Sequence, residues 1–248
     1  MKARFIIVGS GWRAMYYVRI AKALPEKFEL GVMLCRTQEK AEKISQEMAI
    51  HTTTSIEECE QYHPDFVVVA VNKSSIYEVS KEWMAKGYTV LCETPAALKL
   101  EQLQQLWRLR EEKGYKLCVA EQYFRYPSCA AMLSVLEKKV IGEPYNVTLS
   151  LAHDYHGASL IRKILKVTDE AFCVSGRRYI FPVTETASRY EKFSDGRVSD
   201  KKRDRISFEF ENGKAAFYDF CSEQYRSPIR SNYINVQGVR GEMKDEKV

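Results

Sequence analysis

The first half of the chain alternates short, uniformly apolar runs with amphipathic stretches, and this alternation restricts the fold more than any other feature. The most apolar run is FVVVAV at 66–71, which has the length of a strand. A strand this apolar is buried on both faces, as in a parallel sheet covered by helices. The alternation therefore predicts a doubly wound α/β sheet. Strands are expected at 5–8, 30–35, 50–53, 66–71, 88–92 and 116–120, and helices at 12–24, 38–48, 74–86 and 99–113, with a short helix capped by Ser55 and Glu58.

The residue pattern changes beyond about residue 123. Apolar residues alternate by two in 205–211 and 214–221, and the turn pair Asn212-Gly213 separates these segments. This pattern is typical of a β-hairpin. Helical patterns are also present at 127–139 and at about 156–166.

No Gly/Ser-rich linker marks a domain boundary, so we place it by this change of pattern. We expect a doubly wound, Rossmann-type domain over residues 1–123. An α+β domain with a mainly antiparallel sheet is expected over 124–248.

Composition disfavours several classes of protein. The net charge of +5 comes from 38 basic and 33 acidic residues spread along the chain, so no nucleic-acid surface is expected. No window of 18 residues is uniformly apolar, and we expect no membrane span. The seven cysteines form no C-x-x-C pair and share no zinc-like spacing with the four histidines. We therefore expect reduced, buried thiols, a cytoplasmic protein and no metal site.

The segment RFIIVGSGWRAM at 4–15 has the parts of a dinucleotide site. It consists of an apolar strand, a glycine turn and the start of a helix. In such a site Gly9 allows the tight turn, Gly11 lets a pyrophosphate approach the backbone, and Ala14 permits close packing of helix on strand. The alternative is an incidental glycine turn in an α/β protein. The regular alternation that follows favours the cofactor site.

The end of the second expected strand indicates which nucleotide would bind. An acidic side chain there would accept hydrogen bonds from the adenosine ribose, but this chain has Arg36 and Thr37. An arginine suits a 2′-phosphate, so NADP is slightly favoured over NAD, and Arg13 is a second candidate contact. The alternative is that Arg36 simply faces solvent at a helix start. The lack of a carboxylate also disfavours a methyltransferase.

Five segments of the chain combine into a specific pattern: VGSGWRA (8–14), DFVVVAVNKSSIYEVSKEWMAKGYTVLCETP (65–95), EQYFRYP (121–127), IGEPYNV (141–147) and HGASLIRKIL (156–165). Together they resemble the Gfo/Idh/MocA family (glucose-fructose oxidoreductase and inositol 2-dehydrogenase). The resemblance implies a nicotinamide-dependent dehydrogenase or reductase that acts on a secondary alcohol or ketone of a sugar, polyol or related compound. It also implies a homodimer formed through the sheet of the second domain. Family members commonly continue beyond the end of this chain, so we expect the second domain to be incomplete.

Two motifs of the family are altered in the first domain. Where the family usually has Glu-Lys-Pro, this chain has Glu93-Thr94-Pro95. Threonine carries no charge to stabilise a developing alkoxide. Where the family has Pro-Asn followed by His, the chain has Asn72-Lys73. Lys73 is a candidate to supply the missing charge, and a surface lysine at a helix start is the alternative.

The acid/base motif of the family is also altered. It usually has an Asp four residues before a His, and here His156 matches the histidine while Ala152 replaces the aspartate. Asp154 and His153 lie close by in the sequence. An imidazole titrates near neutral pH, so His156 is the best candidate for proton transfer, and an ordinary helix histidine is the alternative. Arg125 either binds an anionic substrate group or forms a salt bridge between domains.

The sequence therefore predicts an NAD(P)-dependent oxidoreductase. The alternative is a non-catalytic nucleotide-binding or regulatory protein that lost the family lysine. The predicted cofactor-binding residues are Gly9, Ser10, Gly11, Trp12, Arg13, Arg36, Thr37, Val71, Asn72, Glu93, Thr94, Pro95 and Gln122; the catalytic candidates are His156, Lys73 and Asp154, and the substrate-binding candidates are Tyr123, Arg125 and His153.

Overall fold

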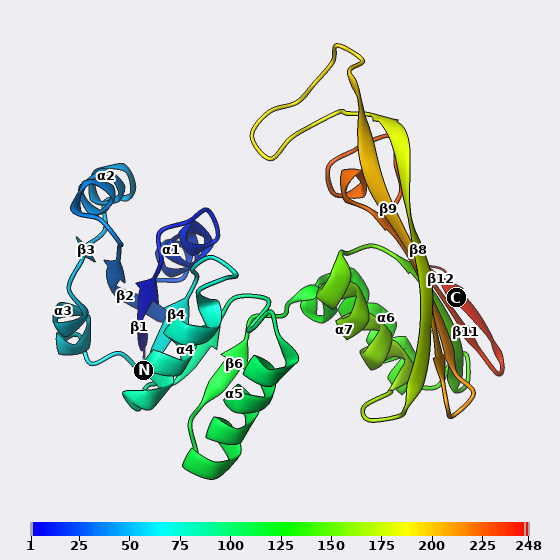
Figure 1. Ribbon diagram of the computed structural model, residues 1–248, viewed down its shortest axis with the longest axis horizontal. Coiled ribbons are helices and arrows are strands. Elements are labelled where there is room, and N and C mark those ends of the chain that lie inside the picture. The colour runs from blue at the N-terminus through cyan, green and yellow to red at the C-terminus, as the bar shows by residue number, and fades with distance from the viewer. Residues whose placement is uncertain (1, 246, 248) are drawn as a thin grey trace. The chain divides into compact units, whose positions relative to one another are not determined.

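The computed structural model describes residues 2–245 and 247. The chain divides into two compact units between Ala120 and Glu121, and each unit is described by itself. The first unit contains a six-stranded parallel sheet in the order β3-β2-β1-β4-β5-β6 (Figure 1). This confirms the doubly wound sheet. Its strands are β1 (Ala3–Val8), β2 (Phe28–Leu34), β3 (Thr52–Thr53), β4 (Phe66–Val69), β5 (Val90–Cys92) and β6 (Leu117–Val119), and its helices are α1 (Ala14–Ala23), α2 (Gln38–Met48), α3 (Ile56–Gln61), α4 (Ile76–Ala85) and α5 (Leu100–Lys113).

The central strand β4 shows why the apolar runs predict a sheet buried on both sides. Val67 and Val69 pack into one core with α4, whereas Val68 packs into the core on the opposite face with α1. All three side chains are fully buried. Burying a valine side chain contributes about 1.5–3 kcal/mol, so both helical layers are held to the sheet by the same short strand.

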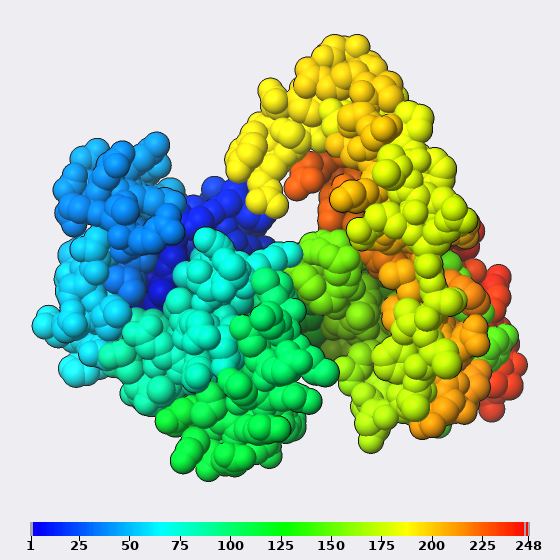
Figure 2. Space-filling view, in the orientation of Figure 1, coloured from blue at the N-terminus to red at the C-terminus, as the bar shows by residue number. Residues whose placement is uncertain are grey.

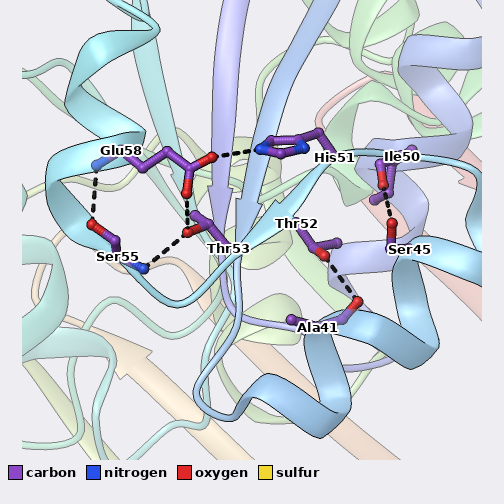
Figure 3. A network of polar contacts seen from close by, with 8 residues as sticks. All are labelled: Ala41, Ser45, Ile50, His51, Thr52, Thr53, Ser55 and Glu58. Atoms are coloured by element: carbon purple, nitrogen blue, oxygen red, sulfur yellow. Dashed lines mark hydrogen bonds and ion pairs between the residues drawn. The ribbon is translucent and has the colours of Figure 1, made fainter.

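A polar network fixes the short strand β3 at the edge of this sheet (Figure 3). Ser55 caps α3 as predicted, because its hydroxyl accepts a hydrogen bond from the backbone N–H of Glu58. The Glu58 carboxylate, however, does not return to Ser55. It accepts from the Thr53 hydroxyl at 2.5 Å and lies 2.6 Å from His51 Nε2. These two hydrogen bonds lower the pKa of Glu58 below its usual range.

The second unit is built on a six-stranded sheet in the order β12-β11-β7-β10-β9-β8, in which only the described pair β7 and β10 is parallel. This confirms the mainly antiparallel sheet. Residues from two helices, such as Leu136 and Leu160, pack with Leu149 of the sheet into one core. The strands are β7 (Pro144–Ser150), β8 (Phe172–Thr184), β9 (Val198–Phe210), β10 (Ala215–Cys221), β11 (Tyr233–Gly238) and β12 (Gly241–Lys244); the helices are α6 (Pro127–Glu137) and α7 (Asp154–Leu165), with 3₁₀ turns η1 (Tyr123–Arg125) and η2 (Ser222–Tyr225).

The edge strand β8 was not predicted. Its side chains are mostly exposed, and it lies at the surface of the second unit with the loop at 185–197 (yellow in Figure 2). Residue-by-residue pairing with β9 holds the strand, from Phe172↔Phe210 to Thr184↔Val198. A strand fixed by backbone pairing rather than by burial leaves little hydrophobic pattern in the sequence.

The prediction that the cysteines are buried is wrong for two of the seven, and both lie on edge strands. All seven are free, and five are buried as expected, but Cys118 and Cys173 are exposed. Cys118 lies on β6 and Cys173 on β8, and each of these is an edge strand of its sheet. Within the described part of the chain, no helix has both the length and the apolar character needed to cross a bilayer.

Candidate functional site

The glycine turn after β1 has the geometry of a phosphate-binding turn. Gly9 has a φ of +112°, and a Cβ atom added there would lie 2.4 Å from the carbonyl oxygen of Ala70, so only glycine fits. At Gly11 an added Cβ would meet no described atom within 4 Å, which leaves the backbone open to approach. Ala14 is fully buried and allows α1 to pack closely on the sheet.

The N-terminus of α1 is suited to an anion. Its first turn contains no acidic residue among those described, so the partial positive charge of the helix end is not neutralised there. Ser10 lies in the same turn, and burial raises the pKa of the Cys35 thiol at the end of β2. The turn and the helix end together fit the pyrophosphate of a dinucleotide.

Glu93 connects the end of β5 to α1. Its buried carboxylate accepts from Arg13 Nε at 2.8 Å and from the Tyr17 hydroxyl at 2.5 Å, both at Oε1. Burial and the nearby Glu93 charge raise the pKa of Tyr17 well above its usual range. Arg13 and Tyr17 are four residues apart and therefore project from the same side of α1. That spacing is the sequence signal for Tyr17, which was not among the predicted site residues.

The remaining cofactor candidates follow the carboxyl ends of parallel strands. Arg36 is exposed after β2, and the Thr37 hydroxyl caps α2 by accepting from the Lys40 N–H at 3.4 Å. The carbonyl of Asn72 accepts at 3.1 Å from the N–H of Ile76, the first residue of α4. Because the strands are parallel, all these segments lie at the carboxyl ends of the strands, on the same side of the sheet. The same side also carries Ser10, Trp12, Val71, Lys73, Thr94 and Pro95.

In the second unit, His156 pairs with a carboxylate that was not among the predicted site residues. His156 Nδ1 lies 2.5 Å from Glu121 Oε2, and both side chains are largely buried. The rings of Tyr123 and Tyr155 pack on the imidazole, with centroids 4.7 and 4.5 Å away. Glu121 and His156 are 35 residues apart, and only the fold shows that they meet.

His153 has a different partner. The Tyr225 hydroxyl accepts from the His153 backbone N–H at 2.9 Å and lies 2.5 Å from His153 Nδ1. Burial raises the pKa of the Tyr123 and Tyr225 phenols. His153 Nε2 lies 3.2 Å from the Tyr155 hydroxyl. Tyr225 was not predicted, because η2 follows β10 and has no distinctive motif.

Asp154 begins α7 two residues before the expected helix start. Its backbone N–H donates to the Tyr218 hydroxyl at 3.1 Å and its side chain is exposed. The carboxylate described in contact with His156 is therefore that of Glu121.

Arg125 and Gln122 have local aromatic partners. Arg125 is exposed with its guanidinium 5.3 Å from the Phe124 ring centroid, and Gln122 Nε2 lies 3.4 Å from the Tyr126 hydroxyl.

Comparison with protein families gives one match to the first unit. Residues 3–121 match the GFO_IDH_MocA family, described as an oxidoreductase family with an NAD-binding Rossmann fold. Comparison with curated proteins gives no match.

Three solved structures are similar in fold. A putative myo-inositol dehydrogenase from Sinorhizobium meliloti 1021 is 16% identical, with a TM-score of 0.76 over 99% of this chain and 76% of its own. An oxidoreductase from Agrobacterium radiobacter in complex with NAD⁺, L-tartaric acid and magnesium is 17% identical, with a TM-score of 0.75 over 98% and 74%. A putative NADPH-dependent oxidoreductase from Desulfitobacterium hafniense is 18% identical, with a TM-score of 0.68 over 96% and 70%. At these identities the similarity establishes the fold.

Proposed function

This chain belongs, through residues 3–121, to the Gfo/Idh/MocA family of oxidoreductases, and we propose that it is a nicotinamide-dependent dehydrogenase or reductase. The proposed substrate is a secondary alcohol or ketone of a sugar, polyol or related compound. The observation that carries the proposal is the turn at Gly9 and Gly11, which fits a dinucleotide at the N-terminus of α1.

We propose NAD or NADP as the cofactor, with NADP slightly favoured. Support for NADP comes from Arg36, which is exposed directly after Cys35 at the carboxyl end of β2, where a 2′-phosphate is bound in such folds. Arg13 pairs with Glu93 through Nε, so Arg36 is the stronger candidate contact. The Agrobacterium radiobacter structure contains NAD⁺, whereas the Desulfitobacterium hafniense protein is described as NADPH-dependent.

In the proposed reaction a nicotinamide bound by the first unit would supply hydride transfer to or from the substrate carbon. His156 exchanges the proton at the substrate oxygen, and Glu121 orients its ring through Nδ1. Lys73 supplies the positive charge that Thr94 lacks. The remaining candidates are Asn72, Val71, Thr94 and Pro95 at the nicotinamide end, Gln122 in cofactor binding, Tyr123, Arg125 and His153 toward the substrate, and Asp154 as a further charge at the start of α7.

Calorimetric titration with NADPH and NADH tests the proposal. Gly11→Leu should keep the fold, because its side chain enters open space, yet weaken binding at least tenfold by blocking the phosphate. Gly241→Leu is the matched control, since an added Cβ there also meets no described atom within 4 Å. Failure of the unaltered chain to bind either nucleotide, or equal binding by Gly11→Leu, would overturn the proposed site.

The replacement of the family lysine by Thr94 favours a second candidate function. In this alternative the chain binds the nucleotide without catalysis and acts as a regulatory protein. Nucleotide binding without turnover on a broad polyol panel would support it.

We also propose a cytoplasmic homodimer that pairs through the sheet of the second unit. Tyr179 and Phe181 stack at 5.8 Å, and strand pairing places them on the same face as Phe217. Phe181 and Phe217 are each 45% exposed, which suits an interface. The free thiols support a reducing compartment. Light scattering, which measures the molar mass in solution, tests the pairing. The parent chain should be a dimer and the Phe217→Lys variant a monomer.

A further inference from the structure

A cavity of about 680 Å³ lies along α7 in the second unit. Tyr155 and Arg162 line it from positions seven residues apart, which places their side chains on the same face of the helix, and Lys166 lines it from the C-cap. Sites for small molecules usually occupy about 300–1,000 Å³, so the cavity has the size of a ligand site.

The wall of this cavity is positively charged. Its charged residues are Arg162, Lys163 and Lys166, and none of the residues described in the wall is acidic. The acidic residues that follow in the sequence are engaged with Thr168: Glu170 accepts from its backbone N–H at 2.6 Å and Asp169 from its hydroxyl at 2.7 Å. A wall with three cations and no carboxylate favours an anionic ligand.

Contacts within the second unit hold two of these cations in place. Arg162 donates from Nε and Nη2 to the carbonyl oxygens of Val167 and Thr168, at 3.4 and 2.6 Å, and Nη1 has no partner among the described residues. Lys163 Nζ lies 4.3 Å from the centroid of the Phe124 ring. A guanidinium fixed in this way loses less conformational freedom when it binds an anion, and phosphate oxygens match its paired N–H donors.

Cations in the last turn of a helix also complement its dipole, and α5 shows this simpler arrangement. It carries Arg110 and Lys113 in its last turn, but the cavity at that end includes the acidic Glu111. The dipole therefore accounts for cations at the end of a helix. It does not account for a cavity wall without an acidic residue.

The cavity also reaches the proposed proton-transfer residue. Tyr155 lies in its wall, and the Tyr155 ring centroid is 4.5 Å from that of His156. From His156 to Arg162 the helix rises about 9 Å, which is comparable to the length of one sugar unit with an attached phosphate.

We propose that Arg162, Lys163 and Lys166 form a phosphate subsite, and that the substrate is a sugar or polyol carrying a phosphate group. Resting on the proposed function, this inference deepens it by naming the substrate class. The reacting hydroxyl lies at His156 and the phosphate lies further along α7. A phosphate monoester carries a charge of about −1.5 to −2 at neutral pH, as does the diphosphate of a nucleotide sugar approximately, and both suit a wall of three cations.

Calorimetric titration of the whole chain without nucleotide tests the subsite. The probes are glucose 6-phosphate, UDP-glucose and unphosphorylated glucose. We expect at least one phosphorylated probe to bind about tenfold or more tightly than glucose, because its hydrogen bonds are charge-assisted. Preference for glucose 6-phosphate identifies a monoester, and preference for UDP-glucose identifies a diphosphate. If neither phosphorylated probe binds more tightly than glucose, the proposal is wrong.

A double variant, Lys163→Gln/Lys166→Gln, tests where the phosphate binds. It should weaken the phosphorylated probe about tenfold or more and leave thermal unfolding nearly unchanged, since both lysines are exposed and Arg162 still holds the end of α7. Arg110→Gln/Lys113→Gln at the end of α5 is the control with the same loss of charge. Equal binding by the parent and the α7 variant would overturn the assignment.

Gly11→Leu separates this subsite from the glycine turn, because binding of the phosphorylated sugar should be unchanged in it. If the sugar phosphate binds at α7 but neither NADH nor NADPH binds, the proposed function fails and the phosphate subsite stands. If a nucleotide binds and the chain turns over unphosphorylated polyols without preferring phosphorylated ones, the subsite fails alone.

Discussion

Arg13 Nε lies 2.8 Å from Glu93 Oε1, which ties the start of α1 to the end of β5. Glu93 is 8% exposed and Arg13 is 33% exposed at the side chain, so removing the arginine leaves a charge that is poorly solvated. We expect Arg13→Met to lower the free energy of unfolding by about 2 kcal/mol.

Urea unfolding of Arg13→Met, Glu93→Gln and the double variant checks this coupling. Arg13→Met/Glu93→Gln should be more stable than Arg13→Met, because the second change removes the unpaired charge. Arg19→Met, an exposed residue on the same helix, is the control. Simple additivity of the two single changes would contradict the ion pair.

Glu58 should make the stability of the first unit depend on pH. Its pKa is lowered in the folded state by hydrogen bonds from Thr53 and His51, so its contribution is present above the unfolded value of about 4.3 and is lost as pH falls through the folded pKa. The Glu58 side chain is 38% exposed, and solvent screening reduces this contribution, so we expect Glu58→Gln to cost about 0.5 kcal/mol at neutral pH and little in strong acid.

Denaturant midpoints measured over a pH series check this. Glu47→Gln is the control, since Glu47 is an exposed partner of Lys43 at 3.8 Å and contributes only a few tenths, about 0.3 kcal/mol. A difference between Glu58→Gln and the parent that does not vary with pH would contradict the predicted role.

Gly157 should not tolerate a side chain although it lies within a helix. Alanine normally stabilises a helix relative to glycine by about 1 kcal/mol. Here the added Cβ would lie 2.7 Å from the Tyr218 ring, whose hydroxyl accepts from the Asp154 N–H. Gly157→Ala should therefore destabilise the second unit by about 1–3 kcal/mol. Thermal unfolding measures this loss of stability. Adding Tyr218→Leu to Gly157→Ala should relieve the clash. A Gly157→Ala variant that is more stable than the parent would show that the ring moves aside.

Strong local patterns made the fold of the first unit predictable. The run containing Val67, Val68 and Val69 indicated burial on both faces, and Gly114 ended its helix with a left-handed φ of +67° as expected of a C-cap. The edge strand β8 was not predictable in this way, because its pairing with β9 uses backbone groups that every residue has.

The candidate site was predictable only where one segment contains it. Gly9 and Gly11 lie in one motif, and His156 stands in another. Glu121 and Tyr225 reach the histidines from distant parts of the chain. Nothing in the spacing of a single sequence reports such a meeting, since it depends on how α7 packs beside η1 and η2.

His156→Ala tests the proposed chemistry directly. We expect turnover on a panel of polyols and sugars with NAD⁺ or NADP⁺ to fall by about 10²–10⁴-fold, because general acid/base catalysis contributes that much. Nucleotide affinity should stay unchanged, since the glycine turn lies in the other unit. Ser159→Ala on the same helix is the control and should retain activity. Full activity in His156→Ala would remove the imidazole from the mechanism, whereas a parent chain that binds nucleotide but turns over no panel member would favour the non-catalytic alternative.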